Sequence, residues 1–79
     1  MCKVKCKVEP GLVSSERVVK IRTIDGYEEE VTVSPRQIEN DSVLKAAEVT
    51  RTDEKVLIEL PREAASGTWR IWVASEFVL

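Results

Sequence analysis

Apolar and polar residues alternate without exception at the start of the chain, in the stretch CKVKCKV. Successive side chains of a β-strand point to opposite faces, so this alternation predicts one half-buried strand over residues 2–8. Its inward row holds Cys2 and Cys6 with two valines, and its outward row holds Lys3, Lys5 and Lys7. The dipeptide Pro10-Gly11 is typical of a turn and ends the strand.

Residues 17–33 predict a β-hairpin, because Asp25-Gly26 separates two runs rich in β-branched residues. A two-residue loop would place Lys20 opposite Val31, whereas a three-residue loop ending in Gly26 pairs Thr23 with Tyr27. The second register gives four cross-strand pairs: Val19–Val31, Lys20–Glu30, Ile21–Glu29 and Arg22–Glu28. In three of these pairs the two residues have opposite charges or are both apolar, so we prefer this register. It does not explain why the apolar Ile21 lies opposite the charged Glu29.

The second half of the chain predicts further strands. Residues 43–48 fit either a helix capped by Ser42 or the start of a strand, and the β-branched pair Val49-Thr50 favours the strand. After a turn at residues 52–54, alternation places Val56, Ile58 and Leu60 inward. Residues 68–73 predict another strand, with Trp69, Ile71 and Val73 on one face and Arg70 and Trp72 on the other. The tail ASEFVL predicts one more short strand, which ties Leu79 into the sheet.

Short strands between turn signals, with no long helical period and no repeat, predict an all-β fold. The expected architecture is a small single-domain antiparallel β-barrel of five to seven short strands, with a β-sandwich as the alternative. Seventy-nine residues are enough for one domain, so residues 1–79 are expected to share a single core.

The closing segment WVASEFVL resembles the end of Src-homology 3 (SH3) domains, in which a strand, a short helical turn and a final strand follow one another. Val73, Ser75, Phe77 and Val78 match that pattern. Ala74 stands where the family has a ligand-packing proline, and Phe77 replaces a tyrosine that helps to bind proline-rich peptides. The resemblance covers about a tenth of the chain and therefore implies an SH3-like barrel topology without implying peptide binding.

Composition and charge restrict the functional class. The chain is 43% hydrophobic and 33% charged, which is typical of a small soluble globular domain. Its net charge of −2 comes from interspersed charges, so nucleic acid is an unfavoured partner. We find neither a signal peptide nor an apolar run of about 18 residues, and two cysteines without a secretory signal indicate reduced thiols in the cytoplasm.

The two cysteines, four residues apart, raise the question of a redox or metal site. On one straight strand they lie about 13 Å apart, too far for a disulfide. Zinc would need more thiolates or imidazoles, and the chain has no histidine and no further cysteine. We therefore expect Cys2 and Cys6 to pack in the core, and we expect neither an enzyme nor a cofactor, because no activated nucleophile or cofactor motif is present.

Trp72, Arg70 and Tyr27, together with Lys3, Lys5 and Lys7, form the candidate binding surface. Trp69 and Trp72 have opposite parity, so a regular strand exposes one of them or covers it with an outer contact. Tryptophan with arginine is typical of protein-binding hot spots. The preferred hypothesis is a non-catalytic interaction or structural module for an unidentified protein partner or a second copy of the chain. The alternative is a small barrel that binds single-stranded nucleic acid.

Overall fold

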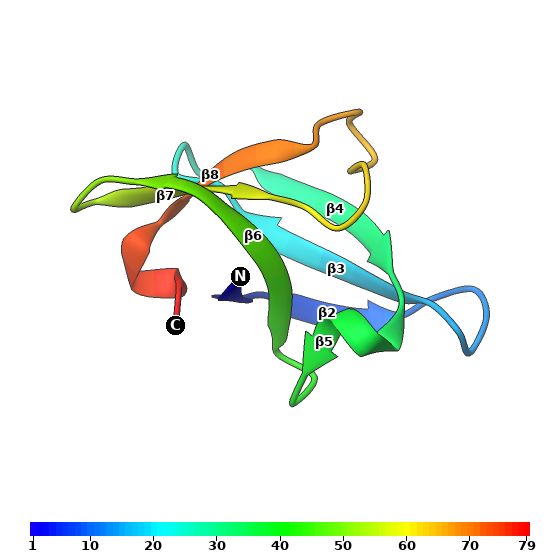
Figure 1. Ribbon diagram of the computed structural model, residues 1–79. Coiled ribbons are helices and arrows are strands. Elements are labelled where there is room, and N and C mark those ends of the chain that lie inside the picture. The colour runs from blue at the N-terminus through cyan, green and yellow to red at the C-terminus, as the bar shows by residue number, and fades with distance from the viewer.

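The computed structural model describes all residues 1–79 and is built from β-strands with two short 3₁₀ turns (Figure 1). The strands are β1 (Cys2–Lys5), β2 (Lys7–Pro10), β3 (Arg17–Arg22), β4 (Glu28–Val33), β5 (Ile38–Glu39), β6 (Val43–Arg51), β7 (Lys55–Glu59) and β8 (Arg70–Ala74). The turns are η1 (Pro35–Gln37) and η2 (Ser75–Phe77). The all-β prediction is confirmed. The structure contains no helix with the length and apolar character needed to cross a membrane.

The fold consists of two antiparallel sheets. One has the order β2-β3-β4, and the other has the order β1-β6-β7-β8 with β5 paired to β6. Neither sheet closes, and their far edges are tied by two hydrogen bonds, from Ile24 N–H to Trp72 O and from Ala65 N–H to Glu30 O, each 2.8 Å long. The fold is therefore a half-closed antiparallel structure, between the predicted barrel and its sandwich alternative.

The predicted single strand over residues 2–8 is interrupted at Cys6. Residues before Cys6 pair with β6 and residues after it pair with β3, so β1 and β2 belong to different sheets. Cys6 pairs with neither strand, and its N–H donates to Ser42 O at 3.0 Å. The alternation of faces was predicted correctly, but the change of partner bends the segment and makes it the junction of the two sheets.

The β3–β4 hairpin has the preferred register, with Lys20 opposite Glu30 and Thr23 N–H donating to Tyr27 O at 2.8 Å. Gly26 ends the loop with φ of 86°, a left-handed conformation that glycine adopts without a side-chain clash. The structure also explains why buried Ile21 lies opposite Glu29. The Glu29 carboxylate is only half-buried and accepts a 2.7 Å hydrogen bond from Ser66 Oγ in the β7–β8 loop.

The region after residue 42 forms the strands that the β-propensity favoured. Residues 43–48 begin β6, as predicted, and the curved β6 carries a register shift between Glu48 and Thr50. Trp69 corrects the prediction, because β8 starts at Arg70 and the Trp69 side chain is 52% exposed instead of lying on the core face. The predicted strand begins two residues before β8 does, so the alternation of faces does not extend to Trp69.

The C-terminal segment was predicted as a strand, but residues 75–77 form the 3₁₀ turn η2. Only the last two residues join the sheet. Val78 bridges Val4, and Leu79 N–H donates to Lys3 O at 2.8 Å. The Leu79 main chain is therefore held in place although its side chain is 65% exposed. Figure 1 shows the two termini close together on one side of the molecule.

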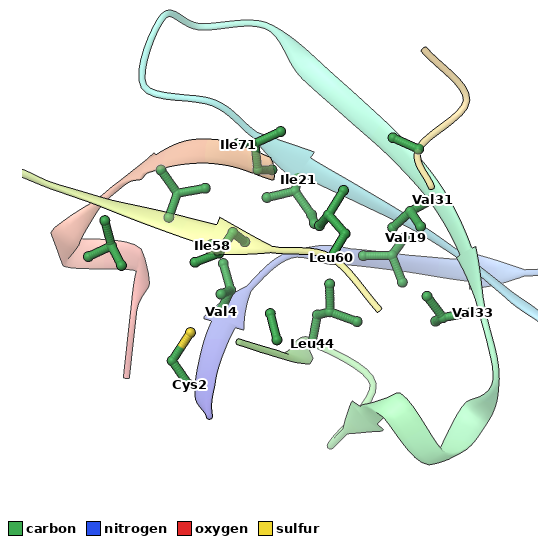
Figure 2. Packing of buried hydrophobic residues seen from close by; sticks show 14 residues of the cluster. Cys2, Val4, Val19, Ile21, Val31, Val33, Leu44, Ile58, Leu60 and Ile71 are labelled. Carbon is green, nitrogen blue, oxygen red and sulfur yellow. The ribbon is translucent and has the colours of Figure 1, made fainter. Parts of the chain in front are cut away.

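A single hydrophobic cluster fills the space between the sheets (Figure 2). Its fourteen members are buried and come from all of the longer strands except β2 and from the β7–β8 loop. Cys2 belongs to this cluster, and Cys6 packs against it from a half-buried position. The prediction of core packing is therefore confirmed for Cys2 and only in part for Cys6, and both are free thiols.

Candidate functional site

A basic groove lies where β1 passes into β2. It has a volume of about 340 Å³. Seven residues line it: Lys5, Cys6, Lys7, Lys20, Arg22, Glu28 and Phe77. They come from the β1–β2 junction, from the β3–β4 hairpin and from η2, so three separate parts of the chain form one concave surface.

Strand geometry explains why the cations meet. Lys5 and Lys7 flank Cys6 and are exposed on the outward row of the bent strand. Lys7 lies directly opposite Lys20 in the β2–β3 pairing, and paired residues on neighbouring strands point to the same face. Like charges in this position are destabilising. The Lys7–Lys20 pair therefore places two positive charges side by side.

Ion pairs with carboxylates neutralise this positive charge only in part. Lys20 Nζ lies 3.4 Å from Glu9 Oε2, but no carboxylate oxygen comes within 4.0 Å of the side-chain nitrogens of Lys5, Lys7 or Arg22. The groove has four positive charges and one negative charge, from Glu28, a net of +3. Because the whole chain has a net charge of −2, the residues outside the groove have a net charge of −5. The lining of the groove is thus basic although the chain as a whole is acidic.

The groove also contains a neutral thiol and an aromatic ring. Burial raises the pKa of the Cys6 thiol to about 11, while a backbone hydrogen bond at Leu44 acts in the opposite direction. Cys6 is therefore uncharged at neutral pH and does not repel an anion. Phe77 is half-buried in η2 and lines the groove beside the cations.

The raised pKa of Cys6 predicts a pH dependence of stability. The unfolded chain releases this proton near pH 9.0, whereas the folded chain holds it until about pH 11, so the unfolded state binds fewer protons between these values. The free energy of unfolding should therefore fall as the pH rises through this window, and the Cys6→Ala variant should lack that part of the decline. Urea unfolding of both proteins from about pH 8 to about pH 11 measures the difference. Parallel pH profiles would show that the thiol does not contribute.

The structure brings together only some of the predicted site residues. Lys5 and Lys7 line the groove, but Lys3 is not among its residues, and its Nζ forms a 2.8 Å ion pair with Glu39 Oε2. The hydrogen bond from Lys3 holds the pKa of Glu39 below its usual range. The predicted row of three lysines is thus divided between a paired residue and two unpaired ones.

The aromatic residues of the predicted surface lie elsewhere. Trp72 is half-buried on the outward face of β8, with Lys55 Nζ 4.4 Å from the centroid of its ring. Arg70 is on the same face, and its Nε lies 3.0 Å from Glu59 Oε1. Tyr27 is 72% exposed beside the β3–β4 turn. None of the three lines the basic groove, so the predicted surface is not one continuous site.

Trp69 lines a second, larger groove of about 420 Å³ on the outward side of β6 and β7. Met1, Ala47 and Pro61 contribute to it, and its two charged residues, Lys45 and Glu59, are of opposite sign. The charged side chains of this groove therefore offset each other.

Sequence reasoning missed Lys20, Arg22 and Phe77 as groove residues. The two cations could have been placed on the outward row of the hairpin, because the preferred register leaves Val19 and Ile21 facing inward. No short-range pattern places Phe77 beside them, since it is seventy residues from Lys7 in the sequence. Its position depends on the pairing of the C-terminal residues with β1.

Comparisons of this chain with protein-family models, with curated proteins and with solved structures find no match. The resemblance of WVASEFVL to SH3 domains therefore stays a prediction.

Proposed function

We propose that this protein is a small non-catalytic binding module that holds an anionic ligand in the basic groove. The observation that carries the proposal is the convergence of Lys5, Lys7, Lys20 and Arg22 on one concave surface of a protein that is otherwise acidic. A bound anion would offset the repulsion between Lys7 and Lys20 and give the unpaired cations partners.

The charge of the groove lining supports this proposal further. A lining with a net charge of +3 attracts an anion, whereas the rest of the chain, with a net charge of −5, does not attract one overall. The ligand would therefore be guided to one place. A ligand with two or more adjacent negative charges fits best, because three of the four groove cations have no carboxylate partner.

The chemistry of the groove supports binding more than catalysis. The chain has no histidine, and Cys6, whose thiol pKa is about 11, is a poor nucleophile at neutral pH. The cytoplasmic location expected from two free cysteines is part of this proposal.

Binding of a protein partner, or of a second copy of the chain, through Trp72 and Arg70 is the weaker candidate. Lys55 already covers the Trp72 ring, and Glu59 already pairs with Arg70. A partner on that face would have to replace these contacts, whereas an anion in the groove replaces none at Lys5 or Lys7.

Titration of the ¹⁵N-labelled protein with sodium pyrophosphate, followed by NMR, tests the proposed function. We expect saturable shifts of the amide signals of residues 5–7, 20–22 and 77, and none in the β6–β7 turn at residues 52–54. A parallel titration with sodium chloride at equal ionic strength is the control. The proposal fails if pyrophosphate produces no change beyond that of chloride, or if the shifts are spread evenly over the surface.

A further inference from the structure

We infer that the anionic ligand is a nucleoside phosphate, whose phosphate is held by the groove cations and whose base stacks on Phe77. This inference rests on the proposed function and adds the chemical class of the ligand. It is carried by the presence of an aromatic side chain and several unpaired cations in one groove.

The cationic part of the groove suits a phosphate. Lys5, Lys7 and Lys20 supply compact positive charges from three strands, β1, β2 and β3, and Arg22 adds a planar guanidinium that can donate two parallel hydrogen bonds to phosphate oxygens. Arg22 lies opposite Glu28 in the β3–β4 pairing, but the two side chains form no ion pair in the structure. The guanidinium is therefore exposed and free to turn toward a ligand.

The main chain on the C-terminal side of Phe77 is held in place. Phe77 is the last residue of η2, and the turn is closed by Val78 N–H donating to Ser75 O at 3.1 Å. Leu79, two residues after Phe77, donates its N–H to Lys3 O at 2.8 Å. Aromatic side chains in positively charged grooves stack on the flat face of a base, whichever base it is. With Phe77 in its lining, the groove should bind a nucleoside phosphate more tightly than a phosphate without a base.

The size and surroundings of the groove favour a single nucleotide over a long strand. A volume of about 340 Å³ is at the lower end of the range for small-molecule pockets, about 300–1,000 Å³. A long polyanion would extend beyond the groove along a protein whose other residues together carry a net charge of −5. Phosphate and base are present both in free nucleotides and in single strands, and this charge distribution favours the free nucleotide.

Affinity measurements with adenosine 5′-monophosphate and ribose 5-phosphate test the inference. The two probes share the phosphate and the sugar, so their difference reports the base. We expect the nucleotide to bind about 5-fold more tightly, and the Phe77→Leu variant to reduce this preference to less than about 2-fold. The matched control is Tyr27→Leu, which removes an exposed aromatic ring outside the groove and should leave the preference unchanged.

A Phe77→Tyr variant retains a ring and should keep the preference, which separates stacking from any loss of folding in Phe77→Leu. If pyrophosphate binds in the groove but the two sugar phosphates bind equally, the inference is wrong and the proposed function stands. If none of the three anions binds, both fail. A single strand of about ten nucleotides that binds more than about 10-fold tighter than the mononucleotide would overturn the preference for a compact ligand.

Discussion

Replacing Ile58 with alanine should lower the free energy of unfolding by about 3 kcal/mol. Ile58 has no exposed surface, and its strand, β7, lies between β6 and β8 in the larger sheet. Truncation would leave a cavity in the only hydrophobic cluster of the fold. For a chain of this length the total stability is about 4–12 kcal/mol, so this one change removes a large share of it.

Urea unfolding measures this effect, and Leu57→Ala is the matched control. Leu57 precedes Ile58 on the same strand but is half-buried on the outward face, so its truncation should cost only about 1 kcal/mol. If Ile58→Ala does not fold, Ile58→Val should fold with a loss of about 1 kcal/mol. Equal losses at positions 57 and 58 would contradict the assignment of Ile58 to the core.

Local patterns predicted much of the fold correctly. Alternation identified the inward residues of β7, and turn chemistry at Gly26 identified the register of the β3–β4 hairpin, because both depend on residues close in the sequence. The interruption at Cys6 could not be predicted in this way. It arises because β1 pairs with β6 and β2 pairs with β3, and alternation is the same whichever strand is the partner.

The candidate site was predicted only in part for the same reason. Lys5 and Lys7 were identified from their outward position on the predicted strand. Lys3 has the same outward position, but it forms an ion pair with Glu39 of β5. Phe77 reaches the groove through the contact between the C-terminal residues and β1. Trp72 was the most prominent aromatic residue of the sequence, yet its contact with Lys55 gives it an intramolecular role.

Removing two groove charges should have the largest effect on binding. In the Lys5→Gln/Lys7→Gln variant, an anion loses two charge-assisted hydrogen bonds, each contributing about 1 kcal/mol at an exposed site. The dissociation constant for pyrophosphate should therefore rise about 30-fold. Both lysines are exposed, and glutamine keeps most of the length of each side chain, so the stability of the fold should change little.

The most direct test compares this variant with Arg36→Gln/Arg62→Gln, which removes the same total charge from two exposed residues outside the groove. The pyrophosphate affinities of both variants and of the unmodified protein would be measured by NMR titration at one ionic strength. We predict a loss of about 30-fold for the groove variant and less than about 2-fold for the control. Equal losses in the two variants would mean that pyrophosphate responds to the net charge alone, and this would contradict the groove as a binding site.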